Sequence, residues 1–349
     1  MDKTVILAVA GSGKTSHIID SLTLKERALL ITYTDANAKT LRRRAVQKFG
    51  HFPDNIRLYT YFTFLYSFSY RPFLAMDVKA RGINWEIPRQ KRRGINQDHI
   101  RYYQDSSRRL YYNRIAKLLA QRGVIPDVIL RIEKYFDRIY LDEVQDLAGH
   151  DFNFFASLCD ANVAFTLVGD YFQHTFDTSR DGSVNRTLYD DVEKYIKRLE
   201  KAGLAVDRDT LKRSYRCSPS VCKFITDAIG IEIDSHRTDD TLVSLVEDDS
   251  EAEMHFNCDS TVKLFYSEHY KYPCYSQNWG ASKGEDHYDD VCVVLSEKNY
   301  KLLEDGNLRS LKPQTRNKLY VACTRSKNNL FFISDKHLNR FKDAAVKSR

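Results

Sequence analysis

The segment AVAGSGKTS, at residues 8–16, has the residue types of a phosphate-binding loop. Gly11 and Gly13 allow backbone N–H groups to approach phosphate oxygens, Lys14 supplies a cation, and Thr15 supplies a hydroxyl for Mg²⁺. The usual pattern, G-x-x-x-x-G-K-[ST], has glycine where this chain has Ala8. Glycine turns are common, but the GKT triplet favours a nucleotide site. Its predicted binding residues are Ala10, Gly11, Ser12, Gly13, Lys14, Thr15 and Ser16.

A pair of acids further along the chain complements this loop. The segment YLDEVQD places Asp142 and Glu143 at the end of a hydrophobic run. Asp142 would hold Mg²⁺ through its water shell, together with Thr15, and Glu143 would orient or deprotonate the attacking water. Acids end strands in many proteins, so the pair gains its meaning from the glycine loop upstream. Together they predict an enzyme that hydrolyses a nucleoside triphosphate, with ATP and Mg²⁺ as cofactors.

These residues need a framework that brings strand ends together. Short apolar runs alternate with stretches of helical spacing, and the helix expected at 35–49 has Asp35 as its cap. Strands that alternate with helices imply parallel sheets, with ligands at the carboxyl ends of the strands. The expected strands are 4–10, 28–34, 56–61, 138–144, 163–170, 289–296 and 329–334.

The sequence changes character near residue 205, which predicts two α/β domains, 1–205 and 206–349. The first domain carries a basic, mostly helical insertion at about 77–134. In the second, the stretch 234–253 is acidic and poor in aromatic residues, so we expect surface loops there.

The composition bounds the class of protein. Hydrophobic residues make up 42% of the 349 residues and charged residues 29%, which is typical of a globular chain and excludes an intrinsically disordered one. No apolar run approaches the length of a membrane span, and no secretory leader is present, so we expect a cytoplasmic protein without membrane contacts. The seven scattered cysteines form no C-x-x-C pair, which favours buried thiols over zinc or a disulfide framework.

Positive charge is concentrated in the insertion. Between Asp77 and Arg122 the chain has twelve Lys or Arg against four acids, whereas its net charge is +7, so the remainder is nearly neutral. Rings are interleaved with these cations at Trp85, Tyr102, Tyr103, Tyr111 and Tyr112. Cations for phosphates and rings for bases are typical of a nucleic-acid surface. A solvated basic helix with its rings in the core is the alternative.

Seven segments together resemble one known family. AVAGSGKT, ITYTDANA, YLDEVQD, LVGDYFQ, LKRSYR, ASKGE and KLYVACTRSK occur in the order found in UvrD/Rep-type helicases of superfamily one. Those helicases also have alanine at the first position of the loop, so the resemblance implies an intact nucleotide site. It extends over residues 5–333 and implies two RecA-like P-loop NTPase domains with the nucleotide between them.

The resemblance also implies roles for residues outside the loop. Gln173 would sense the γ-phosphate, Tyr215 would stack on the base, and Glu285 would contact the ribose. Arg216 and Arg325 would be arginine fingers. The implied catalytic set is Lys14, Asp142, Glu143, Gln173, Arg216 and Arg325. The implied contacts to single-stranded DNA are Tyr33, Thr34, Thr60, Tyr61, Phe62, Phe176 and Lys283, although the rings among them fit a core beside a strand as well.

The chain departs from the family pattern in four respects. One is that ASKGEDHYDD differs from the common KGLEFD, which leaves Asp286 as an alternative to Glu285 for the ribose contact. No glutamine segment for reading adenine precedes the first strand, and no Trp follows GDYFQ, although Phe176 matches another of the family's aromatic positions. The segment 217–280 is too short for the large subdomain that full-size members insert there. The strand-separating activity of the family is therefore less certain to carry over than its ATP hydrolysis.

These observations predict an ATP-dependent translocase or helicase that moves 3′ to 5′ on single-stranded DNA. The alternative is a nucleotide- and DNA-gated subunit that licenses a partner, such as a nuclease or another effector in DNA repair or antiviral defence. RNA is a further substrate option, because stacking contacts do not distinguish it from DNA.

Overall fold

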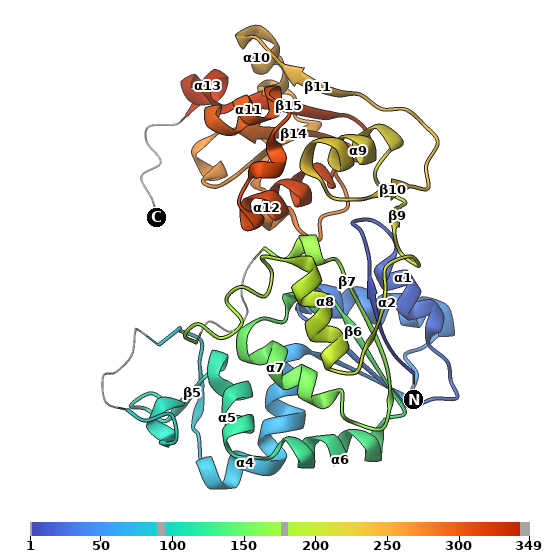
Figure 1. Cartoon of the computed structure of the whole chain (residues 1–349), viewed down its shortest axis with the longest axis vertical. Coiled ribbons are helices and arrows are strands. Elements are labelled where there is room, and N and C mark those ends of the chain that lie inside the picture. Colours follow the sequence, from blue (N-terminus) through green and yellow to red (C-terminus); the bar gives the residue numbers. More distant parts are fainter. Residues whose placement is uncertain (1, 89–94, 176–180, 343–349) are drawn as a thin grey trace. The chain divides into compact units, whose positions relative to one another are not determined.

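The computed structural model describes residues 2–88, 95–175 and 181–342, and these form two compact units (Figure 1). The second unit consists of Ala8–Gly13, Asp170–Thr175 and the chain from Asp209 onward, and the first unit consists of the rest. Two short segments of the first half of the chain thus belong to the second unit.

The first unit is built on a six-stranded parallel sheet in the order β3-β2-β6-β7-β1-β8. Its strands are β1 (Lys3–Leu7), β2 (Ala28–Thr32), β3 (Ile56–Thr60), β6 (Arg138–Asp142), β7 (Ala164–Gly169) and β8 (Ala205–Asp207). All five residues of β2 are buried, whereas the edge strand β3 is only partly buried, as expected for inner and outer positions in a parallel sheet.

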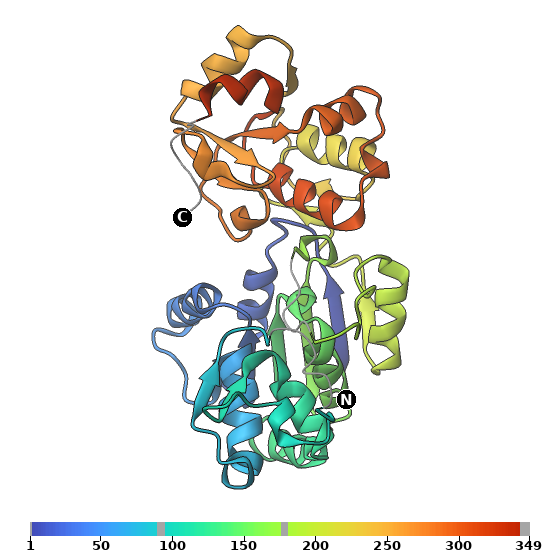
Figure 2. The same ribbon diagram turned by 90° about the vertical axis from the view of Figure 1, so that its left-hand side faces the viewer.

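Helices flank this sheet on both sides (Figures 1 and 2). They include α1 (Lys14–Ser21), α2 (Asp35–Phe49), α7 (Gly149–Leu158) and α8 (Val192–Lys201). The start of α2 corrects one expectation, because its cap is Thr34 and not Asp35. Thr34 has an extended backbone, and its hydroxyl accepts the Asn37 N–H at 3.1 Å, whereas Asp35 already lies in the first turn.

The insertion between β3 and β6 is less helical than expected. Its elements are α3 (Tyr61–Thr63), a π-helix (Phe64–Tyr70), α4 (Arg71–Val78), β4 (Gly82–Asn84), β5 (Arg109–Tyr111), α5 (Ile115–Gln121) and α6 (Ile125–Tyr135). The strands β4 and β5 form a small parallel sheet.

Some of the cations in this insertion are used within the fold. Arg114 and Lys117 bind the carboxylate of Asp181 at 2.9 and 3.0 Å. Burial raises the pKa of Asp181, but the hydrogen bond from Tyr102 and the two cations outweigh it, so the pKa is lowered. Tyr103 is buried, whereas Trp85 is 62% exposed. The cations at 89–93 lie outside the described residues. Some rings of the insertion therefore lie in the core, and others lie at the surface.

The second unit contains a five-stranded parallel sheet in the order β11-β15-β14-β12-β13. Its strands are β11 (Val243–Val246), β12 (Thr261–Phe265), β13 (Ser276–Asn278), β14 (Asp290–Leu295) and β15 (Leu330–Ser334), and β9 (Arg213–Ser214) pairs with β10 (Asp234–Ser235). The helices are α9 (Pro219–Phe224), α10 (Asp249–Asn257), α11 (Glu297–Glu304), α12 (Pro313–Cys323) and α13 (Asp335–Leu338), with a π-helix at Ile225–Ile229.

The two sheets confirm the expected α/β class with parallel sheets flanked by helices. The expectation of loops at 234–253 is wrong, because β11 lies there and α10 begins there. β11 is an edge strand paired only with β15, so its sequence lacks the continuous apolar run of an inner strand. In the described part of the chain, no helix has both the length and the apolar composition required to cross a membrane.

Candidate nucleotide and nucleic-acid sites

The parallel strands of the first unit bring predicted site residues to the carboxyl edge of its sheet. These are Thr60 at the end of β3, Thr34 just after β2, Asp142 at the end of β6, and Lys14 at the start of the helix that follows β1. Residues from separate parts of the sequence meet at this edge because all the strands point toward it.

The glycine loop has the backbone that its sequence predicts. Gly11 and Gly13 adopt left-handed conformations, with φ of 70° and 86°. A Cβ on Gly11 would lie 2.7 Å from Ser214 Oγ and from Arg216 Cβ, so both conformation and space require glycine there. The side chain of Arg216 is thus placed directly against the loop.

The carboxylate of Asp142 lies beside the hydroxyl of Thr15. Thr15 Oγ1 is 3.4 Å from Asp142 Oδ2, and Asp142 is 3% exposed. A hydroxyl and a carboxylate are hard oxygen ligands of the kind that Mg²⁺ takes. The two residues predicted to hold the metal therefore fit that ion.

Glu143 is held by its own backbone and by a neighbour. Its φ of 61° is left-handed, which is uncommon for a residue with a side chain and is concentrated at functional sites. Its N–H donates to Asp142 Oδ1 at 3.0 Å, and Gln145 Nε2 donates to its carboxylate. Gly169 leaves room for Gln145, because a Cβ there would lie 2.2 Å from Gln145 Oε1.

A chain of buried hydrogen bonds in the second unit runs from the loop to Gln173. Ala10 N–H donates to Tyr320 Oη at 2.9 Å, and Tyr320 Oη donates to Asp170 Oδ2 at 2.9 Å. Gln173 Nε2 donates to the same carboxylate oxygen at 3.0 Å. Burial and the Asp170 carboxylate raise the pKa of Tyr320 well above its usual value, so its hydroxyl stays neutral. Sequence reasoning missed Tyr320, whose only signal was its place in KLYVACTR.

The two predicted arginine fingers, Arg216 and Arg325, belong to the second unit, and Arg325 is the more deeply buried of the two. Arg325 is 2% exposed, and its guanidinium donates to the carbonyl oxygens of Val321 and Glu285, both at 3.1 Å. Burial, with the nearby Arg216 guanidinium, lowers the pKa of Arg325 to about 10, so it remains a cation at neutral pH. Arg216 donates to the Thr324 carbonyl at 3.1 Å and pairs with Asp286.

The two acids of the ASKGED segment have different partners. Asp286 forms an ion pair with Arg216, whereas the Glu285 carboxylate lies 3.1 Å from His287 Nδ1. Glu285 contributes its backbone oxygen to Arg325. The ribose contact implied for Glu285 stays a prediction.

Tyr215 presents an exposed ring beside the loop. The residue is 64% exposed, and its ring stacks on His236 with centroids 4.0 Å apart and an interplanar angle of 11°. A Cβ on Gly13 would lie 3.7 Å from this ring. His236 therefore orients a ring that is available to a nucleotide base, a role that no sequence pattern indicated.

The predicted strand contacts fall into different structural classes. The hydroxyls of Thr34 and Thr60 accept backbone N–H groups as helix caps, at 3.1 and 3.3 Å. Tyr61 is 3% exposed, a core position that does not offer its ring to a base, and the half-buried Tyr33 ring stacks on it at 6.4 Å. Lys283 is half-buried. Phe176 lies outside the described residues.

Phe62 leads to a ring that the motifs did not single out. Its centroid lies 4.5 Å from that of Trp85, which in turn lies 5.7 Å from the ring of Tyr112. Because α3 follows β3 directly, this three-ring cluster lies near the carboxyl edge of the sheet. Trp85 extends the row of rings into solvent.

Comparisons with known proteins place this geometry in a family. The family model described as viral superfamily 1 RNA helicase core domain matches residues 125–334, more than half of the chain. A comparison with the curated proteins finds no match.

Solved structures of viral helicases are similar at low identity. The helicase of PRRSV is 14% identical with a TM-score of 0.48, over 99% of this chain and 55% of that one. The arterivirus nonstructural protein 10 helicase in complex with DNA is 14% identical with a TM-score of 0.48, over 96% of this chain and 63% of that one. This chain therefore spans less than two thirds of the length of either helicase.

The predicted superfamily is confirmed by the family match, and the narrower UvrD/Rep-type assignment stays a prediction. By its motifs and by the model that matches most of its length, the chain belongs to the superfamily 1 helicases, in the viral superfamily 1 RNA helicase core domain family.

Proposed function

We propose that this protein is an ATP-dependent translocase that moves along single-stranded DNA and hydrolyses ATP with Mg²⁺. The placement of Arg216 beside the glycine loop supports the proposal, because its Cβ packs against Gly11 and its guanidinium belongs to the same unit as the loop. A glycine loop that only bound a nucleotide would not need this cation.

Each part of the site has a chemical role in the proposal. Lys14 binds the terminal phosphates, and Glu143 orients the attacking water and accepts its proton. When bound, Mg²⁺ is held by Thr15 and Asp142 and neutralises phosphate charge. Arg216 and Arg325 stabilise the charge that spreads over the transferred phosphoryl group. The lowered pKa of Arg325 still leaves it protonated at neutral pH.

The hydrogen-bond chain from Ala10 to Gln173 supports coupling between ATP hydrolysis and the motifs of the second unit. Ala10 belongs to the loop, and Gln173 is the implied γ-phosphate sensor. Tyr320 and Asp170 connect them through buried hydrogen bonds. A change at the phosphates would therefore alter the hydrogen bonds of Gln173 without a new contact.

The DNA track in the proposal consists of rings that stack on bases without reading their sequence. Phe62 and Trp85 are the rings we assign to it, because Trp85 is exposed and contacts Phe62. Movement from 3′ to 5′ follows from the resemblance to UvrD/Rep-type helicases.

Single-stranded RNA is the second candidate substrate, and the description of the matching family favours it. The rings of the proposed track suit either polymer. The two candidates differ only in whether some residue contacts the 2′-hydroxyl.

Steady-state ATP hydrolysis tests the proposal. The purified chain is assayed alone, with oligo-dT and with oligo-rU, beside Glu143→Gln and the exposed control Glu304→Gln. We expect at least tenfold stimulation by oligo-dT and a loss of turnover on the order of 10³-fold in Glu143→Gln only. Stimulation by oligo-rU alone would replace DNA with RNA. Turnover that neither polymer stimulates would reject the translocase and favour a subunit gated by a partner.

A further inference from the structure

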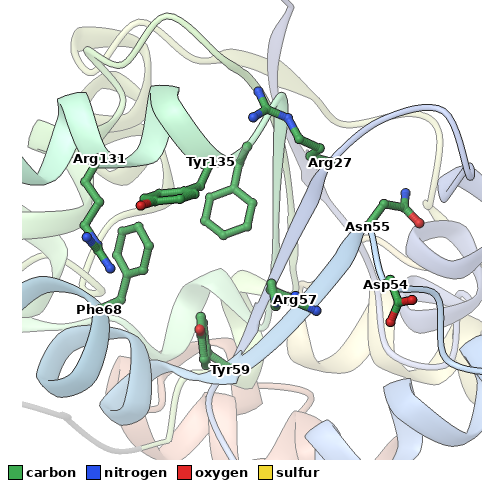
Figure 3. Close-up of a pocket in the computed structure, with 9 residues that line it drawn as sticks. Arg27, Asp54, Asn55, Arg57, Tyr59, Phe68, Arg131 and Tyr135 are labelled. Carbon is green, nitrogen blue, oxygen red and sulfur yellow. The ribbon is translucent and has the colours of Figure 1, made fainter.

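A pocket lies in the first unit, away from the glycine loop (Figure 3). Its volume is about 300 Å³, which is at the small end of the range for ligand pockets. Its lining residues are Arg27, Asp54, Asn55, Arg57, Tyr59, Phe68, Arg131, Tyr135 and Phe136.

The pocket extends from the amino edge of the six-stranded sheet along β3, where Arg57 and Tyr59 line it. Arg27 directly precedes β2, Asn55 directly precedes β3, and Phe136 lies two residues before β6. The loop and the acid pair follow the opposite ends of these parallel strands. The pocket is therefore separate from the nucleotide site, and none of the residues predicted from the motifs lines it.

Two of the three arginines in this pocket lack an acidic partner. Arg27 is committed to Asp137, at 2.7 Å. In the described ranges, neither Arg57 nor Arg131 forms an ion pair, and the buried Nε of Arg131 has no hydrogen-bond partner. A guanidinium without a carboxylate partner keeps its positive charge, so this side of the pocket favours an anionic ligand.

Aromatic rings surround these cations. The Arg131 guanidinium lies between the rings of Phe68 and Tyr135, at 4.9 and 5.1 Å from their centroids. Figure 3 shows Arg131, Phe68 and Tyr135 grouped on one side of the pocket, with Asp54 and Asn55 on the other. Asp54 is the single acid of the lining, so the net charge of the lining is positive.

We propose that this pocket binds one nucleotide unit, with its phosphate on Arg57 and Arg131 and its base against the exposed ring of Tyr135. Guanidinium groups match phosphate geometry, and exposed rings stack on bases. The arginines of the lining would repel a metal ion. Its single acid, Asp54, is too few to bind a basic ligand. A nucleotide unit can come from a polynucleotide strand or from a free nucleotide, and the two sources share this chemistry.

The experiment measures equilibrium binding without hydrolysis, so the inference does not rest on the proposed function and each can fail alone. Fluorescence anisotropy with labelled oligo-dT compares the full chain with Arg57→Gln/Arg131→Gln. The matched control is Lys197→Gln/Lys201→Gln, which removes two exposed cations from α8. Calorimetry with Mg-ADP on a Lys14→Ala background tests the free nucleotide after the loop has lost its lysine.

If the pocket takes a strand, the arginine pair variant loses about tenfold in oligo-dT affinity, and its salt slope falls by about 0.7, the value for one phosphate. The control stays within about twofold. If the pocket takes a free nucleotide, Lys14→Ala still binds Mg-ADP, and Lys14→Ala/Arg57→Gln/Arg131→Gln does not.

The proposal is overturned if the arginine pair variant and the control bind both probes equally. Thermal melts check folding. If Arg131→Gln impairs folding, the exposed Arg57→Glu decides instead: it reverses a charge at the pocket without touching the core, and unchanged binding of both probes rejects the site.

Discussion

The two units share a parallel-sheet design but use the ends of their strands differently. In the first unit, the carboxyl ends carry Asp142, Glu143 and, across the glycine loop, Lys14. In the second unit, β14 leads directly to Ser296, which caps α11 by accepting the Asn299 N–H at 3.4 Å, and β15 leads directly into α13. The two predicted arginine fingers of the second unit lie elsewhere: Arg216 follows β9, and Arg325 follows α12.

This difference indicates a division of labour between two similar folds. In the proposed function, the groups that would accept a proton and hold Mg²⁺ are attached to the strand ends of the first unit. The second unit would contribute two arginines. Arg325 is held by backbone carbonyls, which fix its direction without neutralising it, whereas Arg216 is paired with Asp286. Changes in the first unit should remove chemistry or binding, and changes in the second should weaken the charge stabilisation of that chemistry.

The strongest test of this division is Arg216→Ala. Loss of an arginine finger lowers turnover by roughly 10³-fold or more, while nucleotide binding should persist because the loop and Lys14 are intact. Single-turnover hydrolysis and nucleotide titration measure the two effects. Arg213→Ala, an exposed neighbour in β9, is the control. Unchanged turnover in Arg216→Ala would remove the second unit from the chemistry.

Tyr320→Phe tests the hydrogen-bond chain of the second unit. The change removes the acceptor of the Ala10 N–H and the donor to Asp170, which costs about 1–3 kcal/mol of unfolding free energy. Tyr300→Phe is a matched control, because its buried hydroxyl donates to the Val246 carbonyl at 2.9 Å in the same unit. Denaturant unfolding should show a loss in both, and steady-state assays a loss of turnover in Tyr320→Phe alone. Equal turnover in the two variants would make Tyr320 merely structural.

Trp85→Ala tests whether the first unit binds the strand with its exposed rings. Stacking on one base is worth about 1–3 kcal/mol, so we expect roughly tenfold weaker binding of oligo-dT with little change in stability. Leu24→Ala removes another exposed apolar side chain of the first unit and should have no effect. Anisotropy titrations that give both variants the wild-type affinity would exclude Trp85 from the track.

The smallest effect is expected for Thr34, whose hydroxyl caps α2. Thr34→Ala should lower the unfolding free energy by about 1 kcal/mol, and Thr34→Ser should restore it. If Thr34 also contacts the strand, Thr34→Ala lowers oligo-dT affinity beyond what the stability loss explains. Thermal melts beside anisotropy separate the two roles.

Much of the first unit could be predicted because its signals are local. The glycine loop, the acid pair and the apolar strands are contiguous patterns, and each expected strand is present. The predicted cap of α2 is one residue too late in the sequence. Thr34 and Asp35 are both good caps, and only the backbone angles decide between them. The edge strand β11 was missed because a strand with one neighbour needs no continuous apolar run.

Other features depended on tertiary contacts that no pattern encodes. The burial of Tyr61 could not be predicted, because a tyrosine fits a core and a surface equally well. The stacking of His236 on Tyr215 and the contacts of Tyr320 with Ala10 and Asp170 join residues that are distant in the sequence. The amino-edge pocket was likewise invisible, because its arginines come from three separate segments.

The interleaving of the two units along the chain has a consequence for biosynthesis. Residues 8–13 are made before the segment from Asp209 onward, with which they pack in the second unit. Until then the nascent chain carries the glycine turn without Ser214, Arg216 or Tyr320 beside it. The contacts that fix the backbone of this turn therefore form only after the segment from Asp209 onward has been made.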